Sequence, residues 1–373
     1  TLQMLPGVQT TSDFSSALYV RGSTPDQNLI MLDGIAVYNP YHLGGIFSTF
    51  NTDAIKEADF HSGGFPARYG GRMGAILNVI NREGNTEKIT GSANLSLISS
   101  KALIEGPLPK WKGMKGSWMI SGRRTYIDKV VDALALPSGS KNSDGSDIPL
   151  RFPYYFYDYQ IKANLDIDQD HRLTFTRFYG DDVLDFSYED PSETVSNENV
   201  TIQQDSKFGL DWPWGNQTNG LTWRWIVSPK MITKTFLSNS RYRFDFDLFF
   251  QNRDLYTYSD STVINFINFN WNIYDIIKDR TLETEVQYKY SNDHELTGGF
   301  QIKKIRFDLG IQYDLETQDT SFTWNPLSLK NNTQEISFFL QDRWEVSKRL
   351  KIRSGLRLTD YNCLLYTSPS PRD

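Results

Sequence analysis

The sequence predicts a mainly β protein in two parts, a small α+β domain rich in glycine turns followed by many antiparallel strands. Three observations predict this architecture. Glycine pairs and turn signals recur over residues 18–79. From residue 89 onward, apolar and polar residues alternate with period two, and tight turns alternate with long polar inserts. We expect residues 1–86 to form the first domain and residues 87–360 the second.

Composition favours a strand-built membrane protein. The chain has 373 residues, a formal net charge of −6 and 39% hydrophobic residues, with 20 Tyr and 23 Phe. High aromatic content is typical of transmembrane β-barrels, whose strands face lipid on one side and water on the other. No run approaches the roughly 20 apolar residues of a membrane helix. The alternative is an aromatic-rich soluble β-protein. The absence of a run rich in Lys and Arg argues against nucleic acid as a partner.

Turn signals organise the first domain. Residues 18–20 and 29–32 read as short strands, and Asp33-Gly34 is a hairpin turn signal. We expect one helical turn over residues 51–56. Glycine tolerates positive φ and lets two backbones approach closely. The glycines expected at turns of this domain are Gly22, Gly34, Gly63, Gly64, Gly70 and Gly71.

The clearest strand of the second part covers residues 231–250. Its even positions are largely apolar or aromatic, and its odd positions include Arg241, Arg243, Asp245 and Asp247. Successive side chains of a strand point to opposite faces, and burying charges in a small soluble core is costly. We therefore expect the charged face to line a wide, water-filled lumen. Similar alternation occurs over residues 155–167, 276–290, 335–346 and 350–358.

Two kinds of connection alternate along the second part. Tight turns are expected at residues 166–171, 228–230, 291–294 and 347–349, and long inserts at residues 125–153, 187–204, 252–262 and 308–332. Outer-membrane barrels have short periplasmic turns and longer extracellular loops. Counting on this basis predicts about eleven strands between residues 89 and 359. Residues 126–136 have helix-like apolar spacing, which predicts a short helix in the first insert.

Four motifs occur in order over about seventy residues: LPGVQ at 5–9, VRG at 20–22, LDGIAVYNP at 32–40 and GFPARYGGR at 64–72. In these motifs the chain resembles the plug domain of TonB-dependent outer-membrane receptors, in the form common among Bacteroidota. The resemblance implies that the second part is a transmembrane β-barrel. Because plugged barrels have about 22 strands, the chain holds about half of one. The family's signal peptide, TonB box and closing strand are not found, so we expect a fragment.

The resemblance also implies a function and a location. It implies an outer-membrane receptor of a Gram-negative bacterium that takes up a scarce, bulky solute, such as a siderophore, haem, an oligosaccharide or a peptide. The implied partners are TonB with its inner-membrane energising proteins, outer-membrane lipid, the solute and a surface lipoprotein. The alternative is a ligand-sensing or adhesion receptor that does not transport.

We find no residue set that predicts an enzyme, a cofactor or a metal site. Asp181 with Asp182, and Asp245 with Asp247, are paired carboxylates, which we interpret as part of a solvated face. The 4 His residues are scattered along the sequence. The single Cys, Cys363, excludes a disulfide within the chain.

Charged residues beside the glycines of the first domain are the expected plug–barrel contacts: Arg21, Asp33, Arg68 and Arg72. We expect the arginines to pair with wall carboxylates such as Glu283 or Glu285, because a buried charge needs a partner. The alternative is that they are exposed to lumen water and contribute little.

Residues 37–45 (VYNPYHLGG) are the expected ligand-facing loop. In the resembled family, outward loops of the plug meet the ligand. The candidate substrate contacts are Tyr38, Asn39, Tyr41 and His42, which combine flat apolar faces with hydrogen-bonding groups. The alternative is that these side chains pack the turn.

The last residues depart from the pattern. Residues 361–373 (YNCLLYTSPSPRD) do not continue the alternation. We interpret them as a non-native tail, from translated sequencing adapter.

Overall fold

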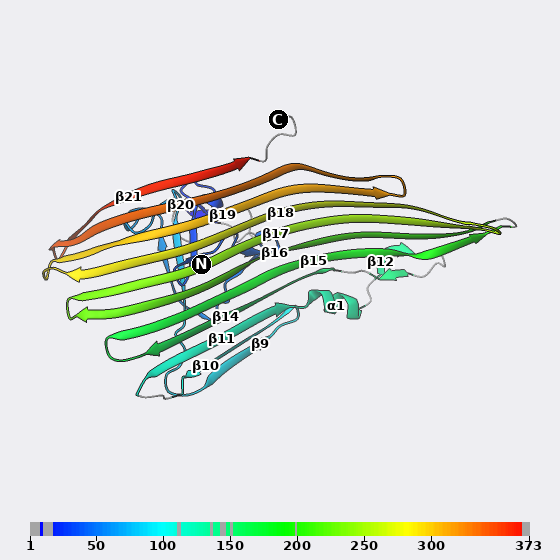
Figure 1. The fold of residues 1–373 in the computed structure, drawn as a ribbon. Helices are drawn as coiled ribbons and strands as arrows, with labels where there is room; N and C mark the ends of the chain where they lie inside the picture. The colour runs from blue at the N-terminus through cyan, green and yellow to red at the C-terminus, as the bar shows by residue number, and fades with distance from the viewer. Residues whose placement is uncertain are drawn as a thin grey trace.

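The computed structural model describes residues 8–9, 18–109, 113–134, 137–141, 147–149, 152–197 and 200–367. It confirms the expected fold class. A small amino-terminal domain lies against a curved, eleven-stranded antiparallel sheet (Figure 1). Of the quoted motifs, residues 5–7 lie outside the described residues. None of the helices in the described ranges is long and apolar enough to cross a membrane.

The amino-terminal domain is built from short strands. A four-stranded sheet has the order β4-β3-β8-β7, with β3 and β8 parallel, and two small two-stranded sheets accompany it. The strands are β1 (Val8–Gln9), β2 (Tyr19–Val20), β3 (Leu29–Leu32), β4 (Ile35–Ala36), β5 (Tyr41–His42), β6 (Phe47–Ser48), β7 (Ile55–His61) and β8 (Ile76–Asn81).

The turn expected at residues 51–56 is present but shorter, and it is not an α-helical turn: the Ala54 amide donates to the Asn51 carbonyl at 3.0 Å. The Oδ1 atom of Asn51 accepts a hydrogen bond from the amide of Asp53 at 3.1 Å, which closes a local turn. Strand β7 then begins at Ile55. Asn side chains favour such turns over helix because they compete for nearby amides.

The Asp33-Gly34 turn joins β3 to β4, as its sequence predicts. Both residues have positive φ, 51° for Asp33 and 83° for Gly34. This matches a type I′ turn, whose twist suits a two-residue hairpin. The amide of Gly34 donates to Asn78 Oδ1 at 3.0 Å, so the turn is also tied to β8.

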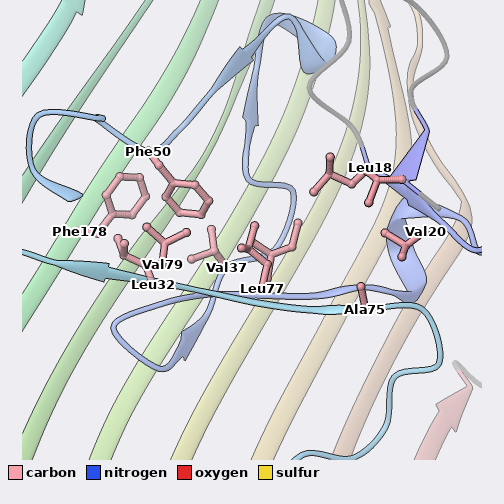
Figure 2. Close-up of a cluster of buried hydrophobic side chains, with 11 residues drawn as sticks. Leu18, Val20, Leu32, Val37, Phe50, Ala75, Leu77, Val79 and Phe178 are labelled. Atoms are coloured by element: carbon pink, nitrogen blue, oxygen red, sulfur yellow. The ribbon is translucent and has the colours of Figure 1, made fainter. Parts of the chain in front are cut away.

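The apolar core of the amino-terminal domain includes one residue of the large sheet. Figure 2 shows Phe178, from β15 (His171–Ser196) of the large sheet, beside Phe50 and close to Leu32 of β3 and Val79 of β8. Leu18 and Val20 lie at the other end of the same cluster. Phe178 is 1% exposed. The buried members of this core are Val8, Leu18, Val20, Ile30, Leu32, Val37, Phe50, Ala75, Leu77, Val79 and Phe178.

In the large sheet, every strand pairs with the next strand of the sheet along the chain. This confirms the predicted count. The strands are β9 (Thr90–Leu95), β10 (Ser99–Pro107), β11 (Lys115–Thr125), β14 (Tyr154–Asp166), β15 (His171–Ser196), β16 (Val200–Ser228), β17 (Met231–Tyr258), β18 (Thr262–Lys289), β19 (His294–Thr317), β20 (Ser321–Ser347) and β21 (Leu350–Thr367).

The long inserts differ from the expectation. Among the described residues of the four inserts, a helix occurs in the first, α1 (Ile127–Leu134), as predicted. It is followed by the small pair β12 (Pro137–Lys141) and β13 (Asp147–Pro149). The other three are not irregular, because the strands continue through them as paired ribbons. These ribbons form the long tips of the sheet in Figure 1. Cross-strand hydrogen bonds satisfy the backbone there, even though the side chains are polar.

The faces of strand β17 are reversed relative to the expectation. Ser240 Oγ donates to the Ala36 carbonyl at 2.7 Å, so the even positions face the amino-terminal domain. The odd positions, including Arg241, Arg243, Asp245 and Asp247, point the opposite way. The neighbouring strand explains this orientation: β17 pairs Phe236 with Glu283, which also faces the amino-terminal domain. Alternation within one strand separates two faces but does not say which face points inward.

Pairing with β20 continues beyond the expected end of the last strand. Thr333 lies opposite Cys363, and the ladder runs to Thr367. Backbone pairing therefore includes part of the segment that we interpret as a non-native tail. Residues 368–373 lie outside the described residues, and the origin of the tail stays a prediction.

We predict that Phe178→Ala loosens the amino-terminal domain from the sheet, with a loss of about 3–5 kcal/mol in the free energy of unfolding. The reason is the cavity left in the shared core. Urea unfolding of the chain in detergent measures this loss. Phe175→Ala is the control, because Phe175 lies on the other face of β15 and is 40% exposed. Equal losses in the two variants would contradict a shared core.

Candidate functional site

The candidate site is the interface between the amino-terminal domain and the large sheet. A cavity of about 330 Å³ lies along it. Charged residues of both signs line this cavity, from the domain and from the sheet: Asp33, Arg68, Glu83, Lys162, Arg172, Arg224, Lys234, Glu283 and Glu285.

Asp33 forms a buried ion pair with Lys162 of β14. The Lys162 Nζ atom lies 2.7 Å from Asp33 Oδ1, and the two side chains are 8% and 6% exposed. Asp33 also accepts hydrogen bonds from the backbone amide and the side-chain amide of Asn81, at 3.1 Å and 2.9 Å. Lys162 in turn donates to the Asn81 carbonyl at 3.0 Å. One lysine thus joins the hairpin turn, the end of β8 and the sheet.

Arg68 contacts both carboxylates that the sequence analysis named. Its Nη2 atom lies 2.6 Å from Glu283 Oε1, and its Nη1 atom lies 3.3 Å from Glu285 Oε2. Burial opposes the charge of Arg68, but the two glutamates outweigh this effect and raise the pKa of the guanidinium. The Arg68 carbonyl also accepts a hydrogen bond from Arg357 of β21 at 2.6 Å.

The other two predicted arginines are placed differently. Within the described ranges, neither Arg21 nor Arg72 has a carboxylate within ion-pair distance. The Arg21 guanidinium lies against Gly63, where a Cβ atom would come within 2.8 Å of it. Arg21 is exposed and lies against its own domain rather than against the sheet. Of the four predicted contact residues, only Asp33 and Arg68 form ion pairs with the sheet.

His42 forms a second attachment to the sheet. Its Nδ1 atom lies 2.6 Å from Asp182 Oδ2, and its Nε2 atom lies 3.6 Å from Asp158 Oδ2. The ring stacks on Phe156 with centroids 4.0 Å apart. Burial alone would lower the pKa of His42, but the two carboxylates outweigh burial and raise it. The imidazole is therefore held toward its charged form.

Asp182 corrects the interpretation of the Asp181-Asp182 pair as solvated. Asp182 is 1% exposed, and its carboxylate also accepts hydrogen bonds from the Leu43 amide at 3.0 Å and from the Tyr154 hydroxyl. Arg123 of β11 makes a neighbouring contact between the sheet and the amino-terminal domain. It donates to Asp158 at 2.7 Å and to the Ser48 carbonyl at 2.8 Å.

The predicted ligand loop also contacts the sheet. The Tyr38 hydroxyl donates to Asp279 Oδ2 at 3.0 Å, and burial together with this carboxylate raises the pKa of Tyr38. Asn39 Nδ2 donates to the Tyr242 hydroxyl at 3.3 Å. Tyr41 packs against the apolar core, and burial raises its pKa. In this structure, Tyr38, Asn39 and His42 hold the domain to the sheet.

The six predicted turn glycines serve two roles. Four have positive φ: Gly22, Gly34, Gly64 and Gly71. The other two are sites of close approach. At Gly70 a Cβ atom would come within 2.6 Å of the Arg357 side chain, and Gly63 lies against Arg21.

Sequence reasoning missed the cations that the sheet contributes. Lys162, Arg123 and Arg357 all contact the amino-terminal domain. Lys162 lies on the polar side of an alternating segment, which was a usable signal. Its partner Asp33 is 129 positions away, so only the fold identifies the pair.

The arrangement attaches the amino-terminal domain to the sheet at several separate points. Charged pairs are spread over the interface and connect different strands. In the part of the chain that the structure describes, no three His, Cys, Asp or Glu side chains are grouped to hold a metal ion.

We predict that Arg68→Glu destabilises the docking of the amino-terminal domain by about 3–5 kcal/mol, because Glu283 and Glu285 would be left buried without their cation. Limited proteolysis of the chain in detergent, quantified as the opening free energy, measures the effect. Arg72→Glu is the charge-matched control. A double variant Arg68→Glu/Glu283→Arg should recover part of the loss; no recovery would argue against direct pairing.

We predict that attachment at His42 weakens at high pH. The pKa of His42 is raised above its ordinary value of 6.5, so its contribution is fully present below about pH 6.5. The contribution is lost as pH rises through the higher pKa of the folded state. Protease susceptibility of the domain, followed against pH, should rise in the native chain. In His42→Gln this pH dependence should disappear, whereas in His171→Gln it should persist.

Comparison with known proteins identifies the amino-terminal part. Residues 1–76 match the family model described as the TonB-dependent receptor plug domain. No curated protein sequence matches the chain.

Among solved structures, the chain has a distant likeness to the siderophore receptor PirA from Pseudomonas aeruginosa. Identity is 12%, coverage is 98% of this chain and 87% of that chain, and the TM-score is 0.34. It is also similar to the outer membrane transporter YddB from Escherichia coli, with 9% identity and a TM-score of 0.35. That match covers 93% of this chain and 75% of that chain. It is likewise similar to the ferric yersiniabactin uptake receptor FyuA from Yersinia pestis. The identity is 11%, the match covers 96% of this chain and 68% of that chain, and the TM-score is 0.35. The family match is the finding that bears on identity: residues 1–76 are similar to the plug domain of TonB-dependent receptors.

Proposed function

We propose that the chain is part of a TonB-dependent outer-membrane receptor that imports a scarce, bulky solute. The observation that carries this proposal is a plug domain attached to a wide antiparallel sheet mainly through charged and polar contacts. In this proposal, residues 1–86 are the plug and residues 87–360 are the first part of a transmembrane barrel of about 22 strands.

The type of interface supports a plug that moves. Ion pairs such as Asp33–Lys162 and Arg68–Glu283 exchange their partners for water when the domains separate. Apolar contacts across the interface, such as Phe47 against Phe156, are exposed to water at the same time. By contrast, the apolar core lies almost entirely within the plug, with Phe178 as the contribution from the sheet. A pulling force would therefore separate the plug from the wall before it unfolds the core.

The cavity beside the ion pairs offers a starting point for a solute path. It lies between Asp33 and Arg68 of the plug and Lys162 and Glu283 of the sheet. Displacing the plug at these pairs would enlarge the cavity. We propose that TonB, acting through a segment amino-terminal to the plug, supplies this displacement.

The finer features of the proposal rest on the sequence motifs. These are a Bacteroidota-type receptor in a Gram-negative outer membrane, a surface lipoprotein partner, and a siderophore, haem, oligosaccharide or peptide as solute. Substrate contact by Tyr38, Asn39, Tyr41 and His42 stays a prediction. Asn39 is the exposed member of this group. Asn39→Ala is therefore the variant that tests contact with the solute while disturbing the packing of the apolar core least.

We predict that deleting the full-length gene causes a growth defect on one iron or carbon source. The defect should require TonB, because import needs energy from the inner membrane. Growth on a panel of sole iron and carbon sources, in strains with and without TonB, is the measurement. A plasmid copy of the gene is the control and should restore growth.

Normal growth on every source, with the protein still in the outer membrane, would contradict nutrient import. Ligand sensing or adhesion without transport would then become the better account.

A further inference from the structure

Five cations of strands β17, β18 and β19 lie together on the face opposite the plug. We call Arg241, Lys278, Arg280, Lys304 and Arg306 the basic patch. Asp279, between Lys278 and Arg280, points to the plug and binds Tyr38. Its two neighbours therefore point outward. Register places Arg241 opposite Lys278, and Lys278 opposite Arg306.

The pairing within the patch is electrostatically unfavourable. Three pairs of like charge lie directly opposite each other: Arg241 with Lys278, Lys278 with Arg306, and Arg280 with Lys304. Like charges in directly opposed positions destabilise a sheet. Such a cluster is stable when an external anion neutralises it.

The chain itself supplies little neutralisation. Asp308 lies 2.8 Å from Arg306. Across the described ranges, the other four cations of the patch have no carboxylate within ion-pair distance. Lys278, Arg280, Lys304 and Arg306 are exposed. The patch is therefore open to a partner that carries several negative charges.

An apolar surface adjoins the patch on the same face. Further along the strands toward the tight turns lie Leu237, four residues from Arg241, and Leu282 and Ile302, two residues from Arg280 and Lys304. Leu282 pairs directly with both Leu237 and Ile302. Leu237 is 51% exposed. Exposed apolar side chains continue on this face, including Phe338 and Leu340 of β20, at 60% and 59%. A partner that covers both surfaces has an anionic end and an apolar end.

We propose that the basic patch binds the phosphorylated headgroup of an anionic membrane lipid, with the acyl chains of that lipid over Leu237, Leu282 and Ile302. Arginine holds phosphate through paired hydrogen bonds, and lysine adds point charge. Basic clusters beside membrane-spanning segments attract anionic lipid. A nucleic acid or an acidic protein would leave the apolar surface uncovered. The inference rests on the proposed membrane location of the sheet and goes beyond the import function.

The test uses the full-length receptor, of which this chain is the proposed first part, inserted into vesicles of phosphatidylcholine with and without lipid A, a bisphosphorylated glycolipid. After detergent extraction, native mass spectrometry measures the lipid that stays bound. We expect the native chain to retain lipid A in preference to phosphatidylcholine. Lys304→Gln should lower this retention about fivefold, and Arg280→Gln/Lys304→Gln about thirtyfold, since each surface cation contributes roughly 1 kcal/mol.

Lys303→Gln is the matched control, because Lys303 lies next to Lys304 on β19 but faces the plug side. It removes the same charge and should leave lipid A retention unchanged. Equal retention of both lipids by the native chain, or an equal loss in Lys303→Gln, would overturn the proposal. Displacement of lipid A by inorganic phosphate alone would overturn the assignment to a lipid.

The test distinguishes a wrong membrane location from a wrong lipid site. A full-length receptor that does not insert into phosphatidylcholine vesicles at all would overturn the proposed location and, with it, this proposal. A chain that inserts but shows no preference for lipid A would overturn the lipid site only.

Discussion

The buried ion pair between Asp33 and Lys162 determines how the plug lies on the sheet. Its two side chains are 6% and 8% exposed, so each charge depends on the other to offset its desolvation. Asp33 also holds the end of β8 through Asn81. The hairpin turn, the central plug strand and the wall are therefore joined at one carboxylate. Other attachments, at Arg68 and His42, extend from this point across neighbouring strands.

The contrast between core and interface explains the mechanical properties that the proposed function requires. The plug core is apolar and nearly self-contained. The interface combines charged pairs, whose members are solvated by water when separated, with smaller apolar contacts such as Phe47 against Phe156. The charged pairs are the part of the attachment that water can replace. The close approach of Arg357 to Gly70 shows that the wall also reaches into the plug through its own cations.

The two faces of the sheet carry charge for different reasons. On the inner face, Asp279, Glu283 and Glu285 meet the plug. On the outer face, Lys278 and Arg280 have no such partner from the plug, because alternation turns them away from it. Over residues 275–285, strand β18 thus carries its anions on one side and its cations on the other. This separation follows from strand geometry, because successive side chains point to opposite faces. The plug covers one face of the sheet and leaves the other face to its surroundings.

The sequence by itself determined the mainly β class, the two-part organisation, the strand count, the Asp33-Gly34 hairpin and helix α1, because turn chemistry and period-two alternation are local properties. The sequence also suggested Arg68 as an ion-pair partner of Glu283 or Glu285. Only the tertiary structure decided which face of β17 points inward, since pairing with β18 sets that choice. Likewise, the burial of Asp182 and the contacts of Lys162, Arg123 and Arg357 depend on residues far apart in the chain. Such contacts follow from register and curvature, which local patterns do not encode.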